Sequence, residues 1–163
     1  MARMDKKPLP AIFLDRDGTI IEDRGHLGLV EEVELFPFAV DALKMLQEKF
    51  LLFIVTNQSG VGLGRVSIEA VNKINAHVLS VLQSHGVTVQ EVYCCSHARR
   101  DNCQCIKPKP YFIRKAQKEF GIDVAGSYTI GDHPHDVAFG EAAGGTGLYL
   151  LTGHGRKHFG ELG

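Results

Sequence analysis

The sequence predicts an α/β domain in which helices cover both faces of a mainly parallel sheet, as in a Rossmann-like three-layer sandwich. Short apolar runs typical of buried strands alternate with stretches of helical periodicity. Polar clusters follow these runs, as expected where parallel strands end at one edge of a sheet. Because 163 residues match the usual size of one domain, we expect a single domain over residues 1–163.

The composition favours an ordinary globular protein, with 44% hydrophobic and 23% charged residues. A net charge of −1 provides no basic field for nucleic acid, so we expect no such partner. Residues 1–8 lack the apolar segment of a signal peptide, and the apolar run 50–55 is too short to span a bilayer. We therefore expect a cytoplasmic protein with no membrane contact. The sequence does not define the oligomeric state, although a monomer is slightly favoured.

The first strand is expected to end at residues 12–14, where the apolar run meets Asp15, Asp17 and Gly18. Two carboxylates at a strand's carboxyl end are costly to bury unless a cation lies between them. Mg²⁺ is the natural candidate, since it combines one or two carboxylates with oxygens of a substrate phosphate. The alternative is a surface turn, in which Asp and Gly are common for local backbone reasons.

A helix beginning near residue 38 and a strand at 50–55 come next, and the strand ends at Thr56 and Asn57. The Thr56 hydroxyl and the backbone N–H groups after it could hold phosphate oxygens, although a plain polar loop is also compatible. Gly60, Gly62 and Gly64 have the wrong spacing for a dinucleotide fingerprint. His26 lies in a polar loop at 22–30 and is a weaker candidate for the substrate rim.

A long helix at 66–85 and a strand at 91–95 lead into the second notable cluster. Cys95, His97, Cys103 and Cys105 form a Cys₃His set, the composition of a structural zinc site. Cys94 is expected to point to the other side of the strand and is excluded from the set. The alternatives are a labile disulfide or incidental thiols.

Lys107 and Lys109 directly follow this cluster and precede a helix expected at 111–120. A strand at 127–130 is then followed by Asp132, which could complete the metal site begun by Asp15 and Asp17. Asp136 lies just before a helix expected at 137–143, where it could cap that helix. A fifth strand is expected at 147–151. No metal is assigned to His133, His135, His154 or His158.

These motifs together resemble the haloacid dehalogenase (HAD) superfamily over nearly the whole chain. They occur in the superfamily's order: Asp15-Arg16-Asp17-Gly18-Thr19, then Thr56, then Lys107, then Gly131-Asp132 with Asp136. Because the chain leaves no room for a large cap domain, it is similar to the minimally capped subclass IIIA. That branch includes the heptose-1,7-bisphosphate and histidinol-phosphate phosphatases, and it carries a zinc loop before the motif lysine.

The resemblance implies a Mg²⁺-dependent phosphomonoesterase that acts through an aspartyl-phosphate intermediate. Asp15 would be the nucleophile and Asp17 the general acid and base. Thr56 and Lys107 would bind the phosphoryl group. Three further phosphate contacts are expected, at Arg16, Asn57 and Lys109. The Mg²⁺ ligands would be Asp15, the Asp17 carbonyl and Asp132, with Asp136 as a further candidate, and a structural Zn²⁺ would occupy the Cys₃His set.

The substrate implied is a small phosphorylated metabolite, with heptose 1,7-bisphosphate the leading example. Heptose bisphosphate phosphatases have arginines at the positions of Leu63 and Ile106, which weakens that assignment; Arg65 or Lys109 could compensate. The alternatives are a histidinol-phosphate phosphatase, a polynucleotide 3′-phosphatase, or a zinc-containing binding module with a vestigial active site.

Overall fold

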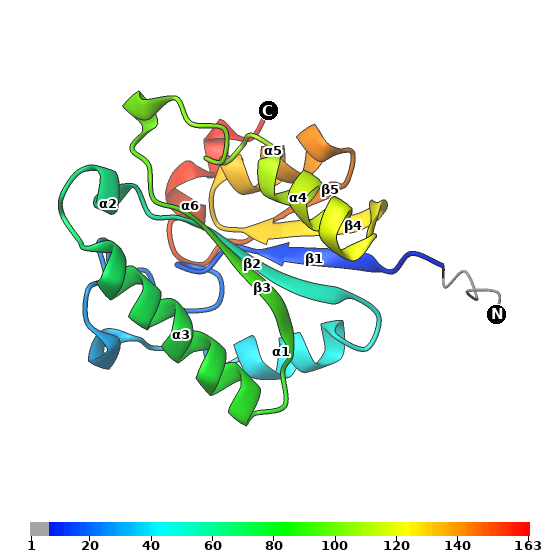
Figure 1. Ribbon diagram of the computed structural model, residues 1–163, viewed down its shortest axis with the longest axis horizontal. Coiled ribbons are helices and arrows are strands. Elements are labelled where there is room, and N and C mark those ends of the chain that lie inside the picture. The colour runs from blue at the N-terminus through cyan, green and yellow to red at the C-terminus, as the bar shows by residue number, and fades with distance from the viewer. Residues whose placement is uncertain (1–6) are drawn as a thin grey trace.

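The computed structural model describes residues 7–163 and contains one five-stranded parallel sheet (Figure 1). Residues 1–6, on which the expectation about a signal peptide partly depends, lie outside the described part. The strand order is β3-β2-β1-β4-β5, so β1 is central and the order reverses beside it. All four strand pairings are parallel. The strands are β1 Pro10–Leu14, β2 Leu51–Asn57, β3 Val89–Cys95, β4 Asp123–Gly131 and β5 Thr146–Tyr149.

Helices cover both faces of the sheet, which gives the predicted three layers. Helices α1 and α3 lie on one face, and α4 and α5 lie on the other (Figure 1). No helix within residues 7–163 is both long and apolar enough to cross a membrane. The α-helices are α1 Ala39–Leu46, α2 Ser59–Gly62, α3 Ile68–Ser84, α4 Tyr111–Phe120, α5 Pro134–Ala143 and α6 Gly155–His158. Short 3-10 helices are η1 Val30–Glu32, η2 Arg99–Asp101 and η3 Phe159–Glu161.

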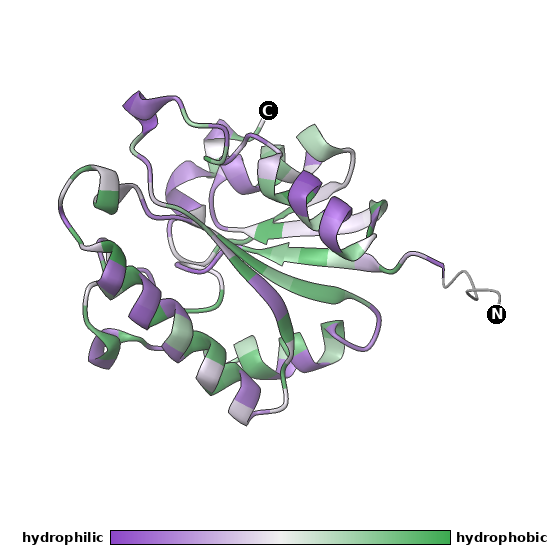
Figure 2. Ribbon diagram, in the orientation of Figure 1, coloured by the Kyte–Doolittle hydropathy of each residue, from purple (hydrophilic) through white to green (hydrophobic). Residues whose placement is uncertain are grey.

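The central strand is apolar on both sides because each side faces a helical layer. Ala11 and Phe13 belong to the core cluster shared with α4 and α5, whereas Ile12 and Leu14 belong to the cluster shared with α1 and α3. This alternation follows from the two-residue period of a strand. Figure 2 shows the hydrophobic residues concentrated along the inner strands. The sheet is therefore a rigid base whose carboxyl edge can hold polar groups in fixed positions.

The predicted elements are all present, and their differences from the predicted bounds are local. Helix α5 begins at Pro134 rather than 137, because proline suits the first turn of a helix and the His133 side chain caps it. Helices α2 and α6 were not predicted, since both are four residues long and contain glycine. The early start of α5 brings Asp136 into its first turn.

Candidate active site

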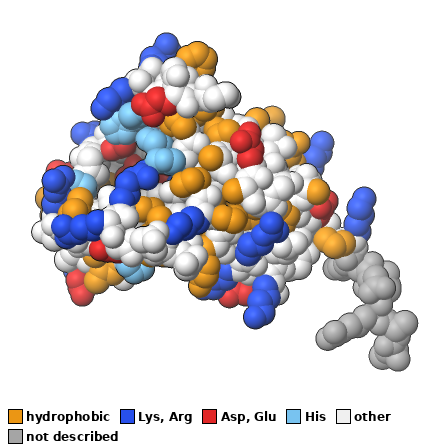
Figure 3. All heavy atoms as spheres, turned by 90° about the horizontal axis from the view of Figure 1, so that it is seen from above, with side chains coloured by type: hydrophobic (Ala, Val, Ile, Leu, Met, Phe, Trp, Pro, Cys, Tyr) orange, Lys and Arg blue, Asp and Glu red, His pale blue; other side chains and the backbone are white. Residues whose placement is uncertain are grey.

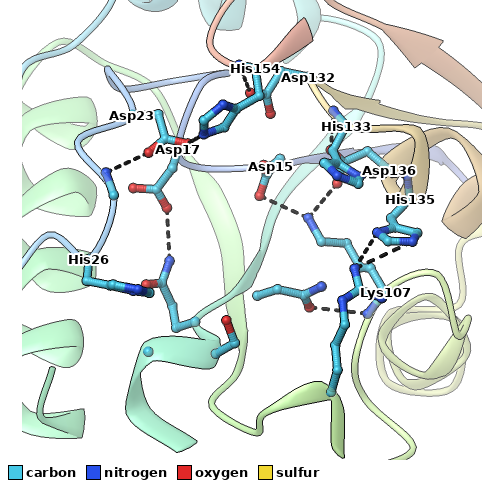
Figure 4. Close-up of a pocket in the computed structure, with 16 residues that line it drawn as sticks. Asp15, Asp17, Asp23, His26, Lys107, Asp132, His133, His135, Asp136 and His154 are labelled. Carbon is cyan, nitrogen blue, oxygen red and sulfur yellow. Dashed lines mark hydrogen bonds and ion pairs between the residues drawn. The ribbon is translucent and has the colours of Figure 1, made fainter. Parts of the chain in front are cut away.

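Side chains from the ends of four strands and from the loop after β3 line one pocket (Figure 4). The pocket lies beside β1 and β4, where the strand order reverses, which is the usual ligand position in open parallel sheets. Its inner part contains Asp15, Asp17, Lys107, Asp132 and Asp136. The structure thus brings together five of the residues that the sequence predicts for the site.

Lys107 is the central cation of the inner pocket. Its Nζ atom lies 2.9 Å from Asp15 Oδ1 and 2.6 Å from Asp136 Oδ1, and it also donates to the carbonyl oxygen of Val55 at 2.9 Å. Burial alone would lower the pKa of Lys107, which is 4% exposed, but the carboxylates of Asp136 and Asp15 outweigh it and raise that pKa. The lysine is therefore held as a charged donor.

Asp132 lies where two glycines let the backbone come close. A side chain at Gly18 or at Gly153 would collide with the Asp132 carboxylate, and both glycines have positive φ angles, 79° and 50°. The backbone N–H of His154 donates to Asp132 Oδ2 at 2.7 Å. Burial, with smaller contributions from Asp15 and Asp136, raises the pKa of Asp132 to about 7. Among residues 7–163, no cationic side chain forms an ion pair with this carboxylate.

The donor set fits a hard divalent cation. Asp15, Asp132 and Asp136 each offer a carboxylate oxygen, and these oxygens lie within 4.8 Å of one another. One ammonium faces three carboxylates, and burial raises the pKa of Asp136 to about 6 even beside Lys107. Oxygen ligands with an excess of negative charge are what Mg²⁺ prefers. The carboxylate of Asp17, which the sequence analysis placed beside that of Asp15, does not belong to this group.

Asp17 is held apart from the other carboxylates by its own partners. Both oxygens accept from the Arg16 guanidinium, with Nε to Oδ2 at 3.0 Å and Nη2 to Oδ1 at 3.1 Å, and Gln58 Nε2 donates to Oδ2 at 2.9 Å. Burial nevertheless raises the pKa of Asp17, against the opposing effect of Arg16. A carboxyl with a raised pKa in a fixed orientation suits proton transfer.

The structure corrects the expected position of Arg16. Its guanidinium is 1% exposed, and Nη1 donates to Asn75 Oδ1 of α3 at 2.7 Å, so it faces α3 and Asp17 instead of a bound phosphate. The hydrogen bond to Asn75 holds the Arg16 side chain against α3 and away from the pocket. Arg16 therefore orients Asp17. Gln58, which the sequence analysis did not select, also contacts this carboxylate from the pocket wall.

Thr56 and Asn57 occupy the end of β2. Asn57 lines the pocket, and its Oδ1 atom accepts from the backbone N–H of Lys107 at 3.2 Å. Thr56 is buried, does not line the pocket, and accepts from Gln58 Nε2 at 2.7 Å through its hydroxyl oxygen. Asn57 thus positions the lysine, and Thr56 retains its hydroxyl proton as a donor.

The Cys₃His set predicted from the sequence comes together in the loop after β3. Its sulfur atoms lie 3.1 to 3.6 Å apart, and His97 Nδ1 lies 3.4 Å from Cys105 Sγ and 3.7 Å from Cys95 Sγ. The cysteines are free thiols, so the disulfide alternative is not what the structure shows. Cys94 lies outside the set, as expected. Four soft ligands at such distances can hold one zinc ion.

The outer pocket contains histidines and an arginine, of which the sequence analysis had named only His26 as a candidate for the substrate rim. Arg99, His133 and His135 line one side, and His26, Asp23 and His154 line another. Burial and the charge of Arg99 lower the pKa of His135 to about 4. In Figure 3 histidine side chains gather beside arginine and lysine side chains on this face. The fold, not any spacing in the sequence, joins these residues.

The basic residues proposed to replace the missing arginines do not line the pocket. Lys109 Nζ donates to the carbonyl oxygen of Cys103 at 2.6 Å and to Asn102 Oδ1 at 2.9 Å, so it fastens the cysteine loop instead of facing a phosphate. Arg65 Nη1 lies 3.0 Å from His26 Nε2, and Arg65 itself does not line the pocket. Ile106 is buried in the core, and Leu63 is exposed at the end of α2.

Comparison with known proteins shows which family this chain belongs to. The HAD-hydrolase-like family model matches residues 104–161. A D-glycero-β-D-manno-heptose-1,7-bisphosphate 7-phosphatase of Yersinia pestis is 35% identical over 89% of this chain and 82% of its own length. The enzyme of the same name from Escherichia coli K12 is 34% identical over 90% of this chain and 82% of its own length. The chain belongs to the HAD-like phosphatases.

A solved structure of this family has the same architecture. The D,D-heptose 1,7-bisphosphate phosphatase of B. bronchiseptica, in complex with magnesium and phosphate, superposes with a TM-score of 0.86 at 28% identity. The match covers 94% of this chain and 87% of that chain. The predicted HAD-like fold with its parallel sheet is confirmed.

Replacing Lys107 by methionine should strongly destabilise the metal-free protein. The change leaves Asp15 and Asp136 buried without their shared cation, and breaking such a pair costs about 3–5 kcal/mol. Urea unfolding in the presence of a chelator measures the loss. Lys118→Met, on the exposed side of α4, should change the free energy of unfolding by about 0.5 kcal/mol or less. Equal effects of the two substitutions would contradict this account of the pocket.

Proposed function

We propose that this chain hydrolyses the phosphomonoester of a small phosphorylated metabolite, with Asp15 as the nucleophile and Mg²⁺ as the cofactor. The observation that carries the proposal is the Lys107 ammonium, which bridges Asp15 and Asp136 while Asp17 is oriented separately by Arg16 and Gln58. Two neighbouring carboxylates in different environments suit two different roles, one as nucleophile and one as acid.

Asp15 would form the covalent intermediate. Lys107 fixes one of its carboxylate oxygens and leaves the other to attack phosphorus, which breaks the ester bond and yields an aspartyl-phosphate. The ammonium and the Asn57 side chain would neutralise or hydrogen-bond the phosphoryl oxygens, whereas Thr56, predicted as a further phosphoryl contact, is buried outside the pocket lining and holds Gln58 instead. The geometry therefore lowers the repulsion between an anionic nucleophile and an anionic substrate.

Asp17 would protonate the leaving alkoxide and then accept a proton from the water that hydrolyses the aspartyl-phosphate. Its raised pKa supports the acid role at neutral pH, because a larger share of the carboxyl is protonated. Two hydrogen bonds from the Arg16 guanidinium and one from Gln58 hold the carboxyl in one orientation through both steps. Regeneration of the protonated form completes the cycle.

Mg²⁺ would be held by Asp15, Asp132 and the backbone carbonyl of Asp17, with Asp136 close enough to assist. When bound, it supplies positive charge that screens the carboxylates and the phosphate from one another. The excess of carboxylates over ammonium groups in the inner pocket supports this assignment.

A sugar phosphate is the substrate class that the relatives favour, and heptose 1,7-bisphosphate is the leading candidate. Leu63 and Ile106 replace two expected arginines, so a histidinol phosphate stays a second candidate. A panel of phosphorylated metabolites ranked by kcat/KM tests the choice. A phosphorylated polynucleotide should rank last, because the net charge is −1.

Replacing Asp15 by asparagine should abolish hydrolysis of any phosphomonoester, since an amide cannot act as the nucleophile. We expect a fall in kcat of roughly 10⁴-fold or more, with the circular dichroism spectrum retained. Wild-type protein should be active with Mg²⁺ and inactive with a chelator. Asp41→Asn on exposed α1 is the matched control and should retain activity. Full activity of Asp15→Asn would refute the mechanism.

Replacing Arg16 by methionine should lower kcat/KM mainly for substrates that have a poor leaving group. If the fork orients Asp17 for protonation, kcat/KM for an alkyl phosphate such as glycerol 3-phosphate should fall roughly 100-fold. For p-nitrophenyl phosphate, whose leaving group needs little protonation, the fall should be about fivefold or less. Arg16→Lys keeps the positive charge but not the two parallel hydrogen bonds of the guanidinium. It should therefore recover only part of the lost kcat/KM for the alkyl phosphate. Equal losses for both substrates would indicate a merely structural role.

Elemental analysis should find about one zinc ion per chain, bound by Cys95, His97, Cys103 and Cys105. Cys105→Ser should lose the ion and lower the midpoint of thermal unfolding. Cys94→Ser removes a neighbouring thiol that lies outside the set, so it should keep the ion. Protein purified under reducing conditions that contains no zinc would exclude the site.

A further inference from the structure

One polar side chain lies on the buried side of α3. Residues that face the core recur along this helix at the three- and four-residue spacing of one helix face, and they are Val71, Ile74, Asn75, Val78 and Leu82. Of these five buried residues, all within the described part of the chain, Asn75 is the only polar one. Burying an amide is unfavourable unless it forms a hydrogen bond. The partner of this amide therefore indicates what the residue does.

That partner is Arg16. Arg16 Nη1 donates to Asn75 Oδ1 at 2.7 Å, and the two residues are only 1% and 9% exposed. The other two nitrogens of the same guanidinium, Nε and Nη2, donate to the two carboxylate oxygens of Asp17. A guanidinium has five N–H donors, so it can bind an amide oxygen and a carboxylate at once. Hydrogen bonds thus connect α3 to the carboxyl group that is proposed to transfer protons.

Asp17 depends on a more distant contact because its bidentate partner is its own neighbour in the chain. Arg16 has a long side chain, which loses rotamer freedom when it is held against the next residue. Asn75 is 59 residues away, on a helix that packs against the sheet on the side opposite α4 and α5 (Figure 1). Its hydrogen bond ties the guanidinium to the core of the protein.

We propose that Asn75 is a positioning residue for proton transfer, since it holds the Arg16 guanidinium in the place from which Arg16 orients the Asp17 carboxyl. The inference rests on the proposed function, in which Asp17 protonates the leaving group. A neutral amide suits this task better than a carboxylate, because it binds the guanidinium without neutralising the charge that faces Asp17. Asn75 does not line the pocket, so it acts through Arg16 and not on the substrate.

The alternative is a purely structural contact, in which the amide only satisfies a buried guanidinium. Such a contact would affect folding, and it would affect all substrates alike. Gln58 cannot separate the two roles, because it donates to Asp17 but also lines the pocket, where it can contact a substrate. Asn75 can separate them, since it lies outside the pocket lining.

The test compares two substrates that differ in how much their leaving group needs a proton. Asn75→Leu removes the amide and suits an apolar helix face. We expect kcat/KM to fall about 10-fold for glycerol 3-phosphate and about twofold or less for p-nitrophenyl phosphate. The fall should lie in kcat and not in KM, because the proton moves in the transition state. Asn72→Leu, the same change at an exposed position of α3, should leave both values within about twofold.

A double-mutant cycle shows whether the effect passes through Arg16. In Arg16→Met protein, adding Asn75→Leu should change the ratio of the two kcat/KM values by about twofold or less. Asn75→Ala removes the same acceptor without adding bulk and should give the same selective loss, so the test holds even if Asn75→Leu does not fold. Equal losses for the two substrates, or an undiminished further loss in Arg16→Met protein, would overturn the inference.

Nuclear magnetic resonance measures the position of Arg16 without turnover. The Nε–H proton of Arg16, identified as the signal missing from Arg16→Met protein, is buried and hydrogen-bonded and should exchange slowly with solvent. Asn75→Leu should accelerate this exchange about 10-fold or more, whereas Asn72→Leu should not. Unchanged exchange in Asn75→Leu protein would overturn the inference.

The two proposals can fail separately. Hydrolysis of phosphomonoesters by the wild-type chain, with no selective loss in Asn75→Leu protein, would leave the proposed function intact and refute the positioning role. Faster exchange in Asn75→Leu protein, in a chain that hydrolyses no phosphomonoester, would refute the proposed function and retain the hold of Asn75 on Arg16.

Discussion

The charge balance around Lys107 is the constraint on which the rest of the pocket depends. Three carboxylates come within 4.8 Å of one another at the edge of the sheet, and one ammonium reaches two of them. Burying like charges is unfavourable unless cations compensate, and a single ammonium cannot neutralise three carboxylates. The remaining deficit makes the site receptive to a divalent cation. A bound divalent cation would offset the excess negative charge of the carboxylates and so allow an anionic substrate to approach them.

The lysine that carries this balance is placed by a loop, and the loop is fastened at several points. The backbone N–H of Lys107 donates to Asn57 Oδ1 at the end of β2, and Lys107 Nζ donates to the carbonyl oxygen of Val55 in the same strand. Cys95 ends β3, and Cys105 lies two residues before Lys107, so a metal ion shared by these cysteines would tie both ends of the loop together. With such an ion bound, the Cys₃His set would help to fix where the ammonium points.

Sequence reasoning could find the inner pocket because strand ends are predictable. An apolar run followed by Asp15, Thr56 or Asp132 marks a carboxyl end, and a parallel sheet brings such ends to one edge. It could not place Arg16, because the direction of a side chain in the turn depends on α3 and Asn75, which are far away in the sequence. It also missed the contact between Arg99 and His135, which joins η2 to the start of α5 across 36 residues of sequence.

Residues at strand ends and residues in connecting segments also differ in how freely they can be substituted. Asp15, Lys107 and Asp132 are fixed by strand ends and by a braced loop, so their geometry tolerates little variation. Arg99 lies in a connecting segment, where a substitution changes the outer pocket without moving the sheet. The catalytic groups can therefore stay constant while the groups facing the rest of the substrate are replaced. Proteins that share the inner geometry share a reaction, and the loop residues decide on which metabolite it acts.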